Sequence, residues 1–217
     1  MRIANKDAEL ARLESMRAFE RKLEAEGFSF IAGIDEVGRG PLAGPVYACA
    51  VILPKDCAIM GVKDSKKLSE KNREELSAII KEKAVAWNIG TADEKEIDSI
   101  NILKATMRAM KDAVNGLSVK ADSLLVDALS LPEIPLRQLA IIGGDGLSIS
   151  IAAASIVAKV ARDALMREYD LTYPEYGFAA HKGYGTKQHI DAIGKHGLCP
   201  IHRVSFAAKF AEAQDTH

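Results

Sequence analysis

The spacing of apolar residues at the start of the chain predicts a helix. Between residues 7 and 27, apolar positions recur every three or four residues among charged ones, as in an amphipathic helix. Gly27 is expected to end it. The apolar positions are Leu10, Leu13, Met16, Phe19 and Leu23. We therefore expect residues 1–27 to form an N-terminal helical extension, in front of a catalytic domain at residues 28–217.

The next part of the chain has the pattern of a strand hairpin followed by a helix. Residues 28–34 and 46–53 are short apolar runs separated by a stretch rich in glycine and proline, so we expect two paired strands with a broad loop. Ser69 can cap a helix that ends at residue 83. Residues 84–91 are expected to form a third strand.

Later in the chain, helical and strand patterns alternate. Residues 97–114 carry an apolar stripe, with Gly116 just beyond it, which predicts a helix packed on a core. Short apolar runs predict strands at residues 123–126 and 138–142, and we expect further helices at residues 148–169, 186–196 and 206–213. A hairpin followed by alternating strands and helices predicts an α/β fold, a mixed sheet flanked by helices with a helical C-terminal part.

The charge is close to balanced overall but uneven along the chain. The formal net charge is -1, so any nucleic-acid site must gather its basic residues on one face. Between residues 177 and 209 the one acid is Asp191. The cationic and histidine residues there are Lys182, Lys187, Lys195, Arg203, Lys209, His181, His189, His196 and His202. This segment is either a basic binding face or an ordinary solvated surface.

The cysteines and the N-terminal sequence indicate an intracellular chain. The three cysteines cannot all pair and show no C-x-x-C spacing, which argues against a disulfide framework or a zinc site. The first residues lead into a charged stretch rather than a signal peptide, and no apolar run reaches the roughly 20 residues of a membrane span. We expect a cytoplasmic monomer that contacts no membrane.

Acidic residues end three of the expected strands. They are Asp35 with Glu36, then Asp127, then Asp145. Sites in α/β sheets gather where strands end. Adjacent residues of a strand point to opposite faces, so Asp35 and Glu36 can share a site only if the strand ends there. Asp127 and Asp145 taken singly are better explained as turn acids, and only the set of four carries a functional interpretation.

Four neighbouring carboxylates raise one another's pKa values unless a cation balances them. Oxygen ligands alone favour Mg²⁺ or Mn²⁺ over zinc, and two such ions about 4 Å apart can clamp an in-line displacement at phosphorus. The acids therefore indicate a nuclease with two divalent ions. Gly38, Arg39 and Gly40 follow the first acids, and glycines let the backbone approach a ligand such as the 2′-hydroxyl of RNA. The same segment is also compatible with an ordinary hairpin loop.

Several long blocks, in order, resemble ribonuclease HII, the bacterial type 2 ribonuclease H. They span roughly residues 31–206. The blocks are GIDEVGRGPLAGPV from Gly33, DSKKLS from Asp64, AAASIVAKV with Arg162 and Asp163, YPEYGF from Tyr173, HKGY from His181, and His202-Arg203.

The resemblance implies a ribonuclease H-like fold and assigns roles to individual residues. Asp35, Glu36, Asp127 and Asp145 would hold the two metals. By the same resemblance, Gly38, Arg39 and Gly40 would contact the 2′-hydroxyl and the adjacent phosphate, and Tyr184 the next deoxyribose. Lys66 is a candidate phosphate contact or part of a helix cap. His202 and Arg203 have either a functional or a structural role.

The implied activity is hydrolysis of RNA paired to DNA, and cleavage 5′ of single ribonucleotides in duplex DNA, leaving 3′-hydroxyl and 5′-phosphate ends. Two differences from the family pattern, Gly143 in place of a lysine and Val204 in place of an arginine, each remove a positive charge. A non-catalytic nucleic-acid-binding module and a DNA nuclease of the same fold are the alternatives. The role of the N-terminal helix is not indicated by the resemblance.

Overall fold

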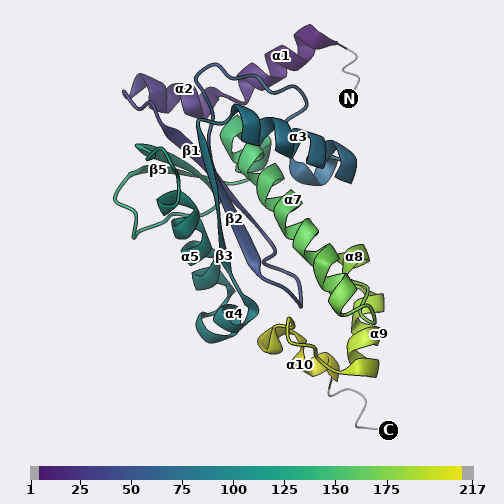
Figure 1. Ribbon diagram of the computed structural model, residues 1–217. Coiled ribbons are helices and arrows are strands. Elements are labelled where there is room, and N and C mark those ends of the chain that lie inside the picture. Colours follow the sequence, from purple (N-terminus) through teal and green to yellow (C-terminus); the bar gives the residue numbers. More distant parts are fainter. Residues whose placement is uncertain (1–4, 212–217) are drawn as a thin grey trace.

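Strand β1 (Ile31–Val37) lies at the centre of a five-stranded mixed sheet in the computed structural model, which describes residues 5–211 (Figure 1). It pairs antiparallel with β2 (Val46–Ile52) and parallel with β4 (Ser123–Asp127). β3 (Ala86–Ala92) pairs antiparallel with β2, and β5 (Arg137–Ile141) pairs parallel with β4, giving the order β3-β2-β1-β4-β5. The expected hairpin and mixed α/β sheet are confirmed.

Alternate residues of β2 serve two separate cores. Ala48, Ala50 and Ile52 belong to the core under α5 (Ile102–Asn115), whereas Cys49 and Val51 belong to the core under α7 (Ile149–Thr172). Figure 1 shows these two helices on opposite sides of the sheet. Successive side chains of a strand point to opposite faces, so the sheet packs against helices on both faces. The result is three layers: helix, sheet and helix. The alanines at the start of α7 let this helix lie close to β1 and β2.

The remaining helices follow the expected order with shifted ends. Ser69 caps α3 as expected, and Gly197 follows α9. The residues expected to form the last helix include 212 and 213, which lie outside the described part of the chain. The other helical elements are α1 (Lys6–Ser15), α2 (Ala18–Ala25), η1 (Ser65–Lys67), α3 (Glu70–Lys83), α4 (Glu94–Ile100), α6 (Gly144–Leu147), α8 (Phe178–His181), α9 (Lys187–His196) and α10 (Val204–Ala211).

The single helix expected at residues 97–114 is wrong, because the chain breaks at Asn101. The φ angle of Asn101 is 71°, and its side chain accepts hydrogen bonds from the N–H groups of Leu103 and Lys104 at the start of α5. A positive φ combined with its extended ψ of 161° is rare for a residue other than glycine. Asparagine is nevertheless a good helix cap. A continuous apolar stripe conceals such a break, since both helices face the same core.

The single N-terminal helix is also wrong, because α1 ends at Ser15 and α2 begins at Ala18. The carbonyl of Met16 accepts a hydrogen bond from the N–H of Ile149 at 3.0 Å. This carbonyl therefore serves the start of α7 rather than the next turn of its own helix. Leu13 and Met16 are buried in the core under α7, and Leu23 packs with Ile151. The domain boundary at residue 27 stays a prediction.

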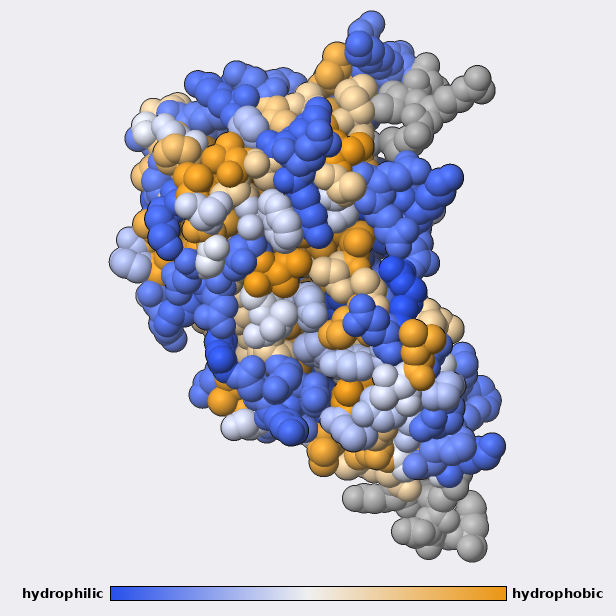
Figure 2. Space-filling model, in the orientation of Figure 1, coloured by the Kyte–Doolittle hydropathy of each residue, from blue (hydrophilic) through white to orange (hydrophobic). Residues whose placement is uncertain are grey.

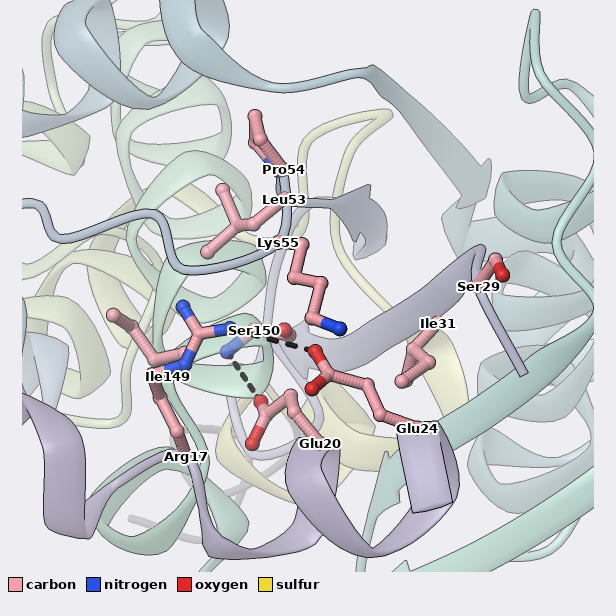
Figure 3. Close-up of a pocket in the computed structure, with 10 residues that line it drawn as sticks. All are labelled: Arg17, Glu20, Glu24, Ser29, Ile31, Leu53, Pro54, Lys55, Ile149 and Ser150. Carbon is pink, nitrogen blue, oxygen red and sulfur yellow. Dashed lines mark hydrogen bonds and ion pairs between the residues drawn. The ribbon is translucent and has the colours of Figure 1, made fainter. Parts of the chain in front are cut away.

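Glu20 attaches α2 to the first turn of α7. Its carboxylate accepts hydrogen bonds from the Ser148 hydroxyl at 2.6 Å and the Ser150 N–H at 3.1 Å. Figure 3 shows the small pocket beside this contact, where Arg17 reaches Glu24 at 3.5 Å. Within the described structure, Arg17 Nε and Glu20 Oε2 are buried without a hydrogen-bond partner. The extension is thus joined to the main core by buried polar contacts.

Both interpretations of residues 177–209, a basic binding face and a solvated surface, are largely wrong, because several of these side chains are not exposed. His181, His189, His202 and Arg203 are buried, in a third core around Tyr176 and Phe178. Aromatic rings surround these imidazoles, so hydrophobic packing and internal hydrogen bonds take the place of solvation. The cations that stay exposed there are Lys187, Lys195 and Lys209, and Lys187 is paired with Asp191.

The face drawn in Figure 2 is mostly hydrophilic, with hydrophobic residues in small groups. Among residues 5–211, no helix combines the length and apolar character needed to cross a membrane.

Candidate active site

The four predicted carboxylates line one cavity of about 360 Å³ where β1 and β4 end. Tyr184 and Lys66 line the same cavity. The structure therefore brings together six of the residues singled out in the sequence. The full lining is Asp35, Glu36, Val37, Ser65, Lys66, Asp127, Gly143, Asp145, Ser155, Lys159 and Tyr184.

Asp35, Glu36 and Asp127 form the tightest group of acids. One carboxylate oxygen from each lies within 4.8 Å of the others. The expectation that β1 ends at residue 34 is wrong, because β1 continues to Val37 beside β2. Its pairing with β4 nevertheless stops at Ile34. Beyond Ile34, β4 no longer pairs with β1. The side chains of Asp35 and Glu36, although adjacent on one strand, can therefore both reach Asp127.

Asp127 also holds the turn that carries Asp145. Its Oδ1 accepts a hydrogen bond from the Gly144 N–H at 2.7 Å, at the start of α6. The interpretation of Asp127 as a turn acid is therefore correct, and it coexists with membership of the acidic group. Asp145 lies in the first turn of α6 and faces the cavity outside the group of three.

Burial and mutual repulsion act on these acids. Burial raises the pKa of Asp35 well above its usual range, and the charges of Glu36 and Asp127 raise it further. Burial also raises the pKa of Glu36, although Arg39 at 3.5 Å opposes this change. The pKa of Asp145 is raised by burial and by Asp64. Ionised carboxylates so close together fit a site that holds cations.

The Gly38–Gly40 loop lies beside this cavity. A Cβ atom at Gly38, where φ is 95°, would lie 2.3 Å from Nε of Arg162, so only glycine fits there. A Cβ atom at Gly40 would lie 3.9 Å from a ring carbon of Tyr184. Tyr184 is 40% exposed. The loop and this tyrosine are thus neighbours at the rim of the acidic cavity.

Lys66 is exposed and lines the cavity, and no ion pair occupies its ammonium group among residues 5–211. Its N–H is capped by Asp64 at 2.9 Å, so Asp64 rather than Lys66 is the cap. Gly143, one of the two differences from the family pattern, also lines the cavity and has open space where a side chain would stand. Val204, the other difference, is 57% exposed.

Several residues of the site were not singled out in the sequence. Ser155 acts on Asp35 by lowering the pKa of that carboxyl, and its hydroxyl lies 2.9 Å from the hydroxyl of Ser65. Lys159 lines the cavity and pairs with Asp163 at 2.7 Å. The one available signal was a set of polar residues inside an alanine-rich helical pattern.

Buried histidines connect Tyr184 to the third core. The Cys199 N–H donates to His202 Nδ1 at 2.9 Å, so the His202 proton is on Nε2. This Nε2–H then donates to His189 Nε2 at 3.0 Å, and His189 Nδ1–H donates to the Tyr184 carbonyl at 3.0 Å. Burial lowers the pKa values of His189 and His202 to about 4, which agrees with neutral rings.

Comparison with known proteins identifies the family. Residues 32–209 match the family model described as ribonuclease HII. A ribonuclease HII from Ruminiclostridium cellulolyticum is 59% identical over 212 residues, covering 97% of this chain and 83% of the relative. The chain belongs to the ribonuclease HII family. It is accordingly an endoribonuclease H of type 2, and the resemblance seen in the sequence is confirmed.

Solved structures agree with this membership. The ribonuclease H2 from Pyrococcus horikoshii OT3 superposes with a TM-score of 0.72 at 26% identity, covering 86% of this chain and 99% of that one. A Bst ribonuclease HIII in complex with Mn²⁺ superposes with a TM-score of 0.65 at 18% identity, covering 85% and 70%. The second likeness concerns the fold alone. The 59% identical match covers 97% of this chain, so it includes nearly all of the sequence of the N-terminal helices.

Proposed function

We propose that this protein hydrolyses the RNA strand of RNA–DNA hybrids and cuts 5′ of single ribonucleotides in duplex DNA, leaving 3′-hydroxyl and 5′-phosphate ends. The observation that carries the proposal is the acidic group of Asp35, Glu36 and Asp127, with oxygens within 4.8 Å, in a cavity shared with Tyr184. A binding-only module gains nothing from acids that face a polyanion. Family membership supports the enzyme over that alternative.

The four carboxylates Asp35, Glu36, Asp127 and Asp145 are the proposed ligands of two divalent ions, Mg²⁺ or Mn²⁺. The oxygen-only donor set of the four, and the raised pKa values of Asp35, Glu36 and Asp145, fit hard cations. When bound, such ions supply an activated water and stabilise the leaving oxygen. Asp127 keeps one oxygen on Gly144, which leaves its second oxygen for a ligand role.

The rim of the cavity is the proposed reader of the substrate. Gly38, Arg39 and Gly40 present backbone groups and one guanidinium to the 2′-hydroxyl and phosphate of the ribonucleotide. Tyr184 packs on the following deoxyribose, and Lys66 contacts a backbone phosphate. Tyr184 at 40% exposure and Lys66 without an ion pair among residues 5–211 are both available to a ligand. The cytoplasmic location and the monomeric state stay predictions.

Asp127→Asn tests the metal assignment. Asparagine keeps an oxygen to accept the Gly144 N–H, so the turn is expected to survive while the charge is lost. We expect cleavage to fall by roughly a hundredfold or more, a typical loss for a charge-stabilising group, with duplex binding retained. Asp191→Asn, on the exposed surface, is the matched control and should cleave normally. Full activity of Asp127→Asn would overturn the two-metal assignment.

A further inference from the structure

Arg203 is a buried cation whose hydrogen bonds all go to one loop. Its side chain is fully buried, and every acceptor is a main-chain carbonyl between residues 38 and 44. Nε donates to Gly44 at 2.9 Å and Nη1 donates to Arg39 and Pro41 at 3.0 and 2.9 Å. Nη2 donates to Gly38 and Gly44, at 2.6 Å each. The five N–H donors of the guanidinium are therefore all used.

Burying the charged guanidinium of Arg203 costs desolvation free energy, which makes its presence here informative. Burial lowers the pKa of Arg203 to about 9, with the nearby charge of Arg162 acting in the same direction. No ion pair with a carboxylate compensates the charge in residues 5–211, and the carbonyl dipoles alone do so. An apolar side chain would fill the same space without desolvating a cation. The planar guanidinium fork instead fixes the direction of each carbonyl it binds.

Fixing the direction of a carbonyl also fixes the direction of the N–H group in the same peptide. In a trans peptide the C=O and the following N–H point in opposite directions. Because the carbonyls of Gly38 and Arg39 point inward to Arg203, the N–H groups of Arg39 and Gly40 point outward. Neither N–H has a hydrogen-bond partner within the described residues. Two adjacent free donors beside the Tyr184 ring form a site for a hydroxyl or phosphate oxygen.

We propose that Arg203 is a positioning residue for ribonucleotide recognition, which orients the Arg39 and Gly40 N–H groups toward the substrate without touching it. This inference rests on the proposed function, because it assumes that the Gly38–Gly40 loop reads the ribonucleotide. Arg162 supports the segment that follows this loop, since it donates to the carbonyls of Ala43 and Pro45 at 3.1 and 2.9 Å.

Arg203→Lys tests the proposal, because lysine keeps the charge and loses the planar fork. Both the variant and its parent carry Asp127→Asn, so that binding is measured while cleavage is strongly reduced. The probes are a DNA duplex with one ribonucleotide and its all-DNA twin, in Mg²⁺. We expect Arg203→Lys to weaken the preference for the ribonucleotide about tenfold, equivalent to about 1.4 kcal/mol. Binding of the all-DNA twin should be unchanged, which a general loss of structure would not give.

Arg137→Lys, an exposed residue paired with Glu26, is the matched control and should keep the full preference. An unchanged preference in Arg203→Lys would overturn the positioning role. If the parent itself shows no preference, the proposed function fails and the inference fails with it. These two failures are distinguishable because the preference of the parent is measured alongside that of the variant, with the same two duplexes.

A second measurement does not depend on the folding of the variant. Amide resonances of Arg39 and Gly40 in the Asp127→Asn protein are followed while each duplex is added. The ribonucleotide duplex is expected to shift both resonances more than the all-DNA twin does. Equal shifts with the two duplexes would overturn the proposal.

Discussion

Removing the Glu20 carboxylate is predicted to loosen the attachment of the N-terminal helices. Glu20 is 4% exposed and accepts from the Ser148 hydroxyl and the Ser150 N–H. The Ser150 N–H lies in the first turn of α7, where no earlier carbonyl of the helix can accept it. In Glu20→Ala this buried donor and the hydroxyl both lose their acceptor.

The expected cost follows from these contacts. A hydrogen bond to a charged group contributes about 1.5–3 kcal/mol, and an anion at a helix N-terminus adds up to about 1 kcal/mol. The second oxygen of Glu20 is buried without a partner in the described structure, and its removal returns about 1–3 kcal/mol. The two bonds and the helix N-terminus together contribute about 3–7 kcal/mol, so the net loss is centred on about 3 kcal/mol. For a chain of this size, that lowers the unfolding temperature by roughly 5–15 °C.

Thermal unfolding with a chelator present measures this loss. Glu20→Gln retains one acceptor oxygen and should lose less stability than Glu20→Ala. The matched control is Glu14→Ala in the same extension, whose carboxylate pairs with Arg21 at 2.9 Å and is 58% exposed. Exposed pairs of this kind contribute at most about 1 kcal/mol. Equal unfolding temperatures for Glu20→Ala and Glu14→Ala would refute the attachment.

Three further predictions concern the site and the third core. Asp35→Asn should unfold at a higher temperature than the parent in chelator, because it removes a buried charge repelled by Glu36 and Asp127, and a lower temperature would contradict this. The folded-state pKa of Asp35 is raised above its unfolded value, so this gain in stability should shrink as the pH falls and Asp35 becomes protonated in the folded state. A gain that grows as the pH falls would contradict the prediction. His202→Ala should cost about 1–3 kcal/mol in chemical denaturation, because it leaves the Cys199 N–H without an acceptor and His189 without its donor. The control is His196→Ala, an exposed histidine, which should lower the free energy of unfolding by under about 0.5 kcal/mol. Equal losses in His202→Ala and His196→Ala would contradict the role given to the buried histidines.

Much of the fold was predictable because local signals and burial agree. The helix cap at Ser69 and the glycine after α9 act within a few residues, and β2 alternates because it separates two cores. The two broken helices depend on contacts that local patterns do not contain. The Met16 carbonyl is taken by Ile149, and Asn101 adopts a conformation that its neighbours in sequence do not require.

The acids of the site were predictable because each lies near or just beyond the end of a strand, and strand ends converge in a sheet of this kind. Arg203 and the buried histidines were not, since their partners are distant in sequence. From the sequence, Arg203 in a basic segment is expected to be exposed. Only the structure shows that carbonyls between Gly38 and Gly44 surround its guanidinium. The roles of individual site residues stay predictions.

Mapping the products from a duplex with one ribonucleotide tests the central claim most directly. The duplex and its all-DNA twin are incubated with Mg²⁺, with Mn²⁺ and with chelator, and the ends are identified. We predict one cut on the 5′ side of the ribonucleotide, with 3′-hydroxyl and 5′-phosphate ends, in either metal and none in chelator. The all-DNA twin should stay intact. Equal cutting of both duplexes, which a DNA nuclease would give, or cutting in chelator would contradict the account.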